Sequence, residues 1–75
     1  MPRRFSAAKF KKQRLQAGLS LEQVAVAIDR SWASVYGYER GRSVPSVDAL
    51  VSLGDALGCD LDSFLEPHVG EGVSS

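Results

Sequence analysis

The sequence predicts an all-α domain built from five short helices, and three observations support this fold class. Residues that cap helix N-termini recur along the chain, and each is followed by a helix-length segment and a residue that ends helices. No segment alternates apolar and polar residues as a half-buried strand does. At 75 residues, 44% of them hydrophobic, the chain has the size of one domain near the lower limit for a self-sufficient core.

The first helix is expected to run from an N-cap at Ser6 to about Ala17, with Gly18 as its end. Phe5 and Phe10 occupy the two positions of a hydrophobic staple, which fixes the angle at which the chain enters a helix. The aromatic pair therefore supports the helix start independently of the serine.

The second helix, about Leu21–Ile28, follows the stretch SLEQ, which is a capping box. Its apolar residues at 24, 25 and 28 are spaced to share one face. Asp29 and Arg30 then form a tight connection, because Asp tolerates a left-handed backbone better than most residues.

Ser31 caps a third helix, Trp32 to about Arg40, which ends at Gly41. The segment contains weak helix formers, including a glycine in its middle. The loop RSVP that follows is expected to be extended, because the residue before Pro45 is pushed out of helical geometry.

A fourth helix, Val47–Leu57, is capped by Ser46 and ended by Gly58, with leucines at 50, 53 and 57 on one face. Asp60 caps a final short helix, Leu61–Leu65, which Pro67 terminates. The predicted domain spans residues 1–66, including a basic arm at 1–5, and a flexible tail follows at 67–75.

The net charge of zero hides a gradient along the chain. Residues 1–14 contain six basic and no acidic residues, whereas residues 43–75 contain six acidic residues and no Lys or Arg. Such asymmetry indicates a polyanionic partner for one end of the chain. The alternative is a solvated basic face beside an acidic one.

Neither an enzyme site nor a cofactor or metal site is expected. Cys59 is the single cysteine and is expected to be a small buried hydrophobe, and His68 is the single histidine and lies in the tail. No Cys/His cluster, phosphate loop or nucleophile–base pair occurs. With no secretory signal and no membrane-length apolar run, the chain is expected to be cytoplasmic and not to enter a membrane.

The run QRLQAGLSLEQVAVAIDRSWASVYGYERGRSVPSVDALVSLGDALGCDLDSFL resembles the lambda-repressor/Cro-like helix-turn-helix domains, the XRE family. Several elements occur in order: GLS before the second helix, VAVAI inside it, ERG closing the third, PS opening the fourth and LG closing it. The resemblance covers most of the chain, about residues 10–65. It implies a bundle in which the second and third helices form the helix-turn-helix, with the third in the major groove of DNA.

The resemblance also implies structural roles. The seam between the two helices falls on Val24, Ala25, Ile28, Val35 and Tyr38. Arg14 and Glu39 match a pair that bridges the first and third helices in relatives, so Arg14 is not counted among the DNA contacts. A half-buried pair of this kind contributes orientation more than stability.

Mapped by motif, five positions of the third helix face the groove: Trp32, Ala33, Ser34, Tyr36 and Gly37. Relatives usually carry Gln, Ser, Thr, Arg or Asn at such positions. Trp32 has one donor and a large apolar face, so it suits a thymine methyl group but not bidentate base contacts. The alternatives are that Trp32 packs on the turn or on a partner subunit, and that Gly37 serves only helix packing.

Phosphate contacts are expected at the starts of the second and third helices, in the loop after the third helix and in the basic arm. The residues are Ser20, Leu21, Ser31, Arg40, Arg42, Ser43, Arg3 and Arg4. Relatives often carry Gln at the Leu21 position, so this contact is reduced to a main-chain N–H here. The exposed arginines alternatively serve solubility, and the arm either follows the DNA backbone or is disordered.

Two functions remain open at this stage. One is a transcriptional regulator that binds double-stranded DNA in a sequence-specific way, as a homodimer on a two-fold operator. The expected dimer surface consists of Leu61, Phe64 and Leu65. The other is a protein-interaction or antitoxin-type module that reuses the fold. We expect no sensing domain after the last helix, so regulation would come from concentration or a separate protein partner.

Overall fold

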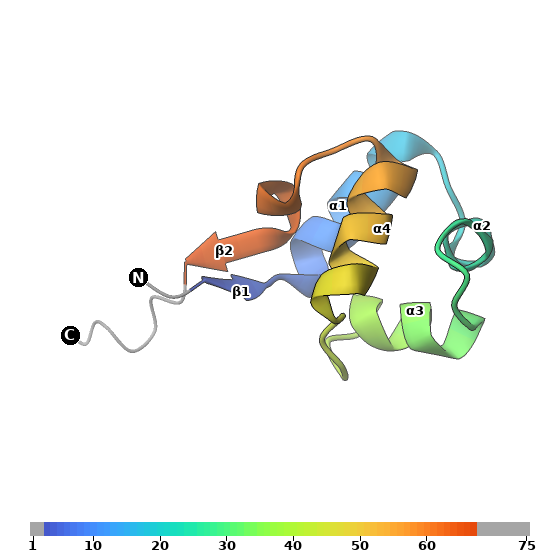
Figure 1. Cartoon of the computed structure of the whole chain (residues 1–75), viewed down its shortest axis with the longest axis horizontal. Helices are drawn as coiled ribbons and strands as arrows, with labels where there is room; N and C mark the ends of the chain where they lie inside the picture. Colours follow the sequence, from blue (N-terminus) through green and yellow to red (C-terminus); the bar gives the residue numbers. More distant parts are fainter. Residues whose placement is uncertain (1–2, 68–75) are drawn as a thin grey trace.

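The structure, a computed structural model, describes residues 3–67 and contains four α-helices, one 3-10 turn and a two-stranded sheet (Figure 1). The order along the chain is β1 (Arg3–Phe5), α1 (Ala7–Ala17), α2 (Leu21–Ala27), α3 (Trp32–Glu39), α4 (Val47–Leu57), η1 (Leu61–Phe64) and β2 (Leu65–Pro67). Within this part of the chain, no helix has both the length and the hydrophobicity that crossing a membrane requires.

The four α-helices confirm the first four helices expected from the sequence, with ends that differ by no more than one residue. Each begins after a serine whose hydroxyl oxygen accepts a backbone N–H three residues later, at 3.1 or 3.2 Å. These serines are Ser6, Ser20, Ser31 and Ser46. Gly18 and Gly58 end α1 and α4 in the left-handed conformation, with φ of 73° and 70°.

The fifth helix expected from the sequence is not confirmed as an α-helix. Leu61–Phe64 forms a single 3-10 turn, closed by an N–H of Ser63 that donates to the carbonyl of Asp60 at 3.0 Å. The Asp60 side chain makes no cap hydrogen bond. Leu65 then turns to extended geometry, with φ of −111° and ψ of 149°, so the chain leaves the helical conformation after one turn.

The expectations of no strand and of a free basic arm are also wrong. β1 pairs with β2 in antiparallel register, with Arg3 opposite Pro67 and Phe5 opposite Leu65. The N–H of Ser6 extends this contact by donating to the carbonyl of Phe64 at 2.7 Å. Three-residue strands are too short to show alternation, and the partners are far apart in sequence.

The strand pair also moves the predicted domain boundary, because Pro67 is part of β2 and not of a tail. Residues 68–75, including His68, and residues 1–2 lie outside the described residues.

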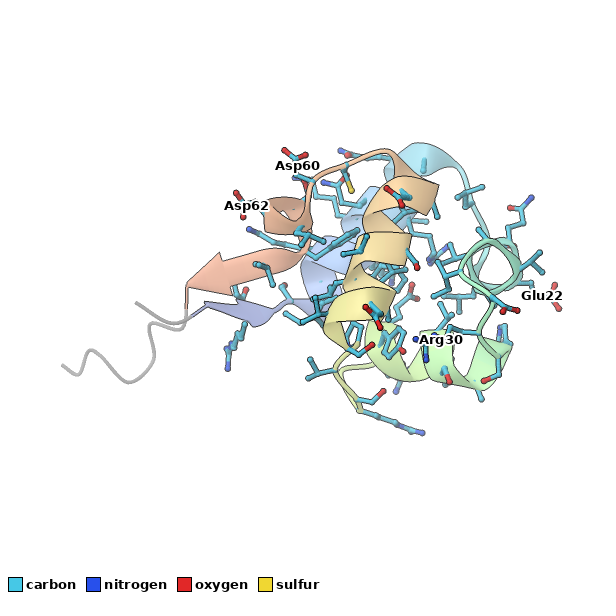
Figure 2. All side chains as sticks on the ribbon, viewed as in Figure 1. Glu22, Arg30, Asp60 and Asp62 are labelled. Atoms are coloured by element: carbon cyan, nitrogen blue, oxygen red, sulfur yellow. The ribbon has the colours of Figure 1, made fainter. Side chains whose placement is uncertain are left out.

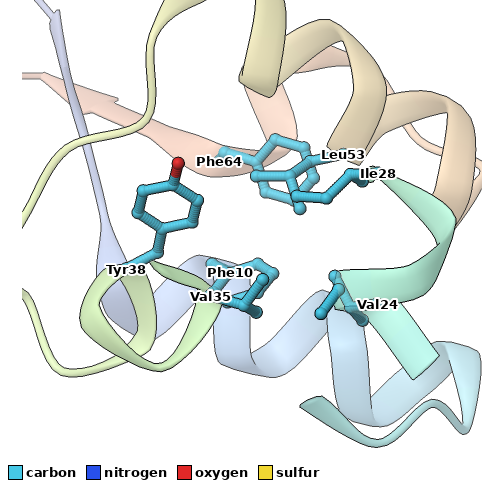
Figure 3. Close-up of a cluster of buried hydrophobic side chains, with 8 residues drawn as sticks. Phe10, Val24, Ile28, Val35, Tyr38, Leu53 and Phe64 are labelled. Atoms are coloured by element: carbon cyan, nitrogen blue, oxygen red, sulfur yellow. The ribbon is translucent and has the colours of Figure 1, made fainter. Parts of the chain in front are cut away.

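The hydrophobic core is assembled from α1, α2, α3, α4 and η1, whose buried side chains point to a common centre (Figure 3). Its members are Phe10, Val24, Ala25, Ile28, Val35, Tyr38, Leu53 and Phe64. The Phe5 ring packs at its edge, 6.2 Å from the Phe10 ring and 6.4 Å from the Tyr38 ring between centroids. The predicted staple is therefore present and also ties β1 to the core.

Phe64 corrects the expected dimer surface. Its side chain is fully buried, and its ring lies 6.2 Å from that of Phe10 in an edge-on arrangement. It therefore completes the core of one subunit and is not available to a second. Leu61 and Leu65 are half-buried, and their role in a dimer stays a prediction.

Candidate nucleic-acid interface

The turn between α2 and α3 places α3 steeply across α2. Asp29 adopts φ of 57°, and the N–H of Arg30 donates to the carbonyl of Ala25 at 3.0 Å. This left-handed turn confirms the tight connection expected from the sequence. Figure 1 views α2 almost along its axis and α3 from the side, so the pair has the crossing of a helix-turn-helix.

The apolar seam expected at this crossing is confirmed, since all five of its residues are buried. They are Val24, Ala25, Ile28, Val35 and Tyr38. Because these side chains point inward, the opposite face of α3 is left to solvent.

The predicted ion pair between α1 and α3 is also confirmed. Arg14 Nε donates to Glu39 Oε1 at 2.7 Å, and the two side chains are only 11% and 12% exposed. Arg14 Nη1 also donates to the carbonyl of Leu19 at 2.8 Å. One guanidinium therefore fixes α3 and the segment before α2 against α1.

The outer face of α3 carries a row of three side chains spaced one turn apart. The rings of Trp32 and Tyr36 are stacked, with centroids 4.8 Å apart and planes 9° apart. The guanidinium carbon of Arg40 lies 5.6 Å from the centroid of the Tyr36 ring. We call Trp32, Tyr36 and Arg40 the α3 ladder.

Sequence reasoning missed this ladder, although a signal was present. Residues four apart on a helix are neighbours, so aromatic, aromatic and Arg at positions 32, 36 and 40 face one another. Trp32 thus packs on Tyr36, which neither of the two interpretations of Trp32 had included. It remains 47% exposed, so nearly half of its surface is still open to a partner.

The other three predicted base-reading positions differ in accessibility. Ala33 is exposed, whereas Ser34 is half-buried and its Oγ accepts from the hydroxyl of Ser31 at 3.0 Å. A Cβ added to Gly37 would lie 3.0 Å from Ser43 Oγ. The loop after α3 therefore approaches Gly37 closely, through the side-chain hydroxyl of Ser43.

The predicted phosphate contacts at the helix starts are partly occupied by the fold. The N–H of Ser20 donates to Gln23 Oε1 at 2.8 Å, which completes the capping box. The Leu21 side chain packs against the core. Ser31 is exposed, and its hydroxyl caps α3.

The loop after α3 carries exposed positive charge. Arg40, Arg42 and Ser43 are all exposed. The loop is held to the helix by the N–H of Arg42, which donates to the carbonyl of Gly37 at 2.9 Å. Arg42 therefore has a fixed backbone and a side chain open to solvent.

Part of the basic N-terminal segment is engaged by the fold itself. Arg4 Nε donates to Glu66 Oε2 at 3.2 Å, and Lys9 Nζ donates to the carbonyl of Leu65. Arg4 is thus tied across the sheet, which contradicts both a trailing and a disordered arm at this residue. Arg3 lies in β1, and its contact with phosphate stays a prediction.

The charges near α3 differ from those at the opposite side of the molecule. Figure 2 shows Asp60 and Asp62 beside η1, away from α3, and Arg30 near the start of α3. Arg30 before α3, and Arg40 and Arg42 at and beyond its end, are exposed positive charges close to this helix in the chain.

Cys59 is half-buried and packs against the core, close to its expected role. Burial raises the pKa of its thiol, with a further rise from Asp60 that a hydrogen bond with Ser63 partly offsets. Among the described residues, no three His, Cys, Asp or Glu side chains gather as a metal site would require.

Comparisons with known proteins agree on one family. The family described as "Helix-turn-helix domain" matches residues 7–64. A putative helix-turn-helix transcriptional regulatory protein of Aeropyrum pernix is 42% identical over 62 residues, which are 83% of this chain and 18% of that protein. One of Sulfurisphaera tokodaii is 38% identical over 58 residues, 77% of this chain and 20% of that protein.

The chain thus spans about a fifth of the length of these curated relatives. Among solved structures, the restriction-modification controller protein C.AhdI from Aeromonas hydrophila superposes with a TM-score of 0.72 at 26% sequence identity. The match covers 76% of this chain and 86% of that one.

Proposed function

Because the chain belongs to the helix-turn-helix domain family, we propose that it binds double-stranded DNA with α3 in the major groove, as the DNA-binding module of a transcriptional regulator. The observation that carries this proposal is the face of α3 left open by the seam. Trp32 and Ala33 are exposed at its start, and Arg40 and Arg42 are exposed at and beyond its end. Its role is binding and not catalysis.

The arrangement of charges supports this mode of binding. Helix-turn-helix domains place the first residues of the second helix against base edges and surrounding residues against phosphates. Arg30 precedes α3 in the chain, Arg42 follows it, and both are exposed. Contacts of this kind position the protein without reading sequence.

We propose further that the DNA-bound form is a homodimer on a two-fold operator. Val47 and Val51 lie one turn apart on α4, both exposed, and Val44 is exposed just before this helix. Val44 also lines an open cavity of about 720 Å³, together with Leu50 and Leu65. An exposed apolar surface of this kind is typical of a protein interface. In such a dimer, the two copies of α3 would enter the major groove of DNA about 34 Å apart.

The DNA proposal is tested by selecting bound sequences from random duplex DNA and measuring their affinity by fluorescence anisotropy at several salt concentrations. We expect preferred sequences with two-fold symmetry and a slope of log affinity against log salt of several units. Absence of duplex binding at low salt would instead support the alternative, a protein-interaction module.

The dimer proposal is tested separately by sedimentation of a Val47→Ser/Val51→Ser variant. Both side chains are exposed, so the fold is expected to be retained while self-association weakens. Val26→Ser is the matched control, because Val26 is also exposed but lies on α2. Unchanged association in the double variant would place the dimer surface elsewhere.

A further inference from the structure

The α3 ladder orders the side chains at the start of α3 before any partner arrives. One face of the Trp32 indole is covered by Tyr36, with ring planes 9° apart, and the side chain as a whole is 47% exposed. The indole is therefore held as a flat, outward-lying apolar surface.

The side chains around Trp32 offer few hydrogen bonds to a base. Ala33 presents only a methyl group, and the Ser34 oxygen is already engaged by Ser31. Bidentate recognition of guanine or adenine needs Arg, Lys, Asn or Gln. None of these occurs between Trp32 and Glu39, so the first turn of α3 is poorly equipped to read purine edges.

One feature of the major groove does suit an apolar surface. Thymine carries a 5-methyl group there, and apolar side chains recognise it by contact. A 5-methylcytosine places the same group at the same position. The chemistry of Trp32 and Ala33 thus matches the methylated edge of a pyrimidine.

We propose that the first turn of α3 reads the 5-methyl groups of pyrimidines, with Trp32 and Ala33 as specificity-determining residues and Tyr36 as a positioning residue. This proposal rests on the DNA-binding function above. Tyr36 acts through its two neighbours on α3. Its ring stacks on the Trp32 indole one turn before it, and the Arg40 guanidinium lies over the same ring one turn after it. The Arg40 guanidinium therefore lies back along the outer face of α3.

The test uses a duplex selected from random DNA, in which each thymine is replaced in turn by deoxyuridine. This change removes only the methyl group and leaves base pairing intact. For the unaltered protein we expect about a fourfold loss of affinity at one or two positions, which is the value of burying one methyl group. At the same positions, a duplex with a 5-methylcytosine–guanine pair should bind more tightly than one with a cytosine–guanine pair.

Three variants assign the effect to the ladder. In Trp32→Ala the deoxyuridine penalty should disappear, in Tyr36→Ala it should shrink, and in Tyr36→Phe, which keeps the ring, it should return. Val26→Ala is the control, because that exposed residue lies on α2. Circular dichroism checks that each variant is folded.

The outcomes separate this proposal from the function on which it rests. A protein that binds duplex DNA with clear base preferences but shows no deoxyuridine penalty overturns methyl reading and leaves DNA binding intact. A penalty that persists in folded Trp32→Ala also overturns it. Failure to bind any duplex overturns the proposed function itself.

Discussion

Arg14 of α1 and Glu39 of α3 are joined by a hydrogen-bonded ion pair of 2.7 Å, 25 residues apart in sequence and largely shielded from water. Arg14 also donates to the carbonyl of Leu19, so its removal leaves two acceptors without this donor. Glu39 is the last residue of α3, and the pair therefore sets where α3 ends relative to the core.

Arg14→Met should lower the free energy of unfolding by about 3 kcal/mol, because it leaves the Glu39 carboxylate shielded and unpaired. Arg4→Met is the matched control: its pair with Glu66 is exposed, and we expect a loss below about 1 kcal/mol. Urea denaturation measures both. Equal losses in the two variants would show that the Arg14–Glu39 pair has no special weight.

The same pair predicts recovery in a double variant. Arg14→Met combined with Glu39→Leu removes both charges together, so most of the stability lost in Arg14→Met should return. If orientation of α3 is the role of the pair, the double variant should regain stability but not DNA affinity. Recovery of both would contradict an orienting role.

Two helical glycines should respond in opposite ways to alanine. A Cβ on Gly54 would lie 2.8 Å from the carbonyl oxygen of Cys59, which belongs to the backbone and cannot turn away. A Cβ on Gly37 meets only the movable hydroxyl of Ser43 at 3.0 Å. Gly54→Ala should therefore lose about 2 kcal/mol or more, whereas Gly37→Ala should be neutral or gain up to about 1 kcal/mol from helix propensity.

Thermal and urea unfolding of these two variants give the comparison. A Gly37→Ala variant as damaged as Gly54→Ala would mean that the loop after α3 has no room to adjust. Gly37→Ala would then also be expected to disturb Arg42, whose N–H donates to the Gly37 carbonyl.

The predictable parts of the fold were those encoded by neighbouring residues. Serine caps, the capping box at Ser20 and the glycine at Gly18 act within one helical turn, and the sequence was sufficient to locate them. The pairing of β1 with β2 joins residues at opposite ends of the described chain, such as Arg3 and Pro67. Such pairing depends on where the core brings the two ends together, which no local pattern records.

The candidate site also has parts that could be predicted from the sequence and parts that could not. The seam and the Arg14–Glu39 pair followed from the family resemblance. The partners of Arg4 and Lys9 did not, because they lie in β2, whose existence was not predicted. A count of basic residues therefore overstated the positive charge free to contact DNA, because the nearness of Glu66 to Arg4 cannot be read from the linear sequence.

Cys59 should react with alkylating reagents more slowly in the folded protein than in the unfolded one. Burial raises the pKa of its thiol, so less of the reactive thiolate is present at a given pH. Because the folded pKa is the higher one, the contribution to stability is complete below the unfolded pKa and is lost as pH rises through the folded pKa. Iodoacetamide labelling from pH 7 to pH 10, followed by mass spectrometry, gives the pH at which the labelling rate of Cys59 is half-maximal. If this pH is no higher in the folded protein than in the urea-unfolded chain, the assignment is contradicted.

Salt dependence should distinguish an arginine proposed to contact DNA, Arg42, from one that the fold has engaged, Arg4. Arg42 is exposed on a loop whose backbone is fixed to α3, so Arg42→Ala should weaken binding to all duplexes alike. It should also reduce the slope of log affinity against log salt by about one unit for each subunit bound. Arg4 is paired with Glu66 across the sheet, so Arg4→Ala should leave the slope nearly unchanged.

Anisotropy titrations of both variants at four salt concentrations, on a selected duplex and on random duplex, provide the comparison. A larger slope change for Arg4→Ala than for Arg42→Ala would place the phosphate contacts at the sheet, and the orientation of α3 proposed above would then be wrong.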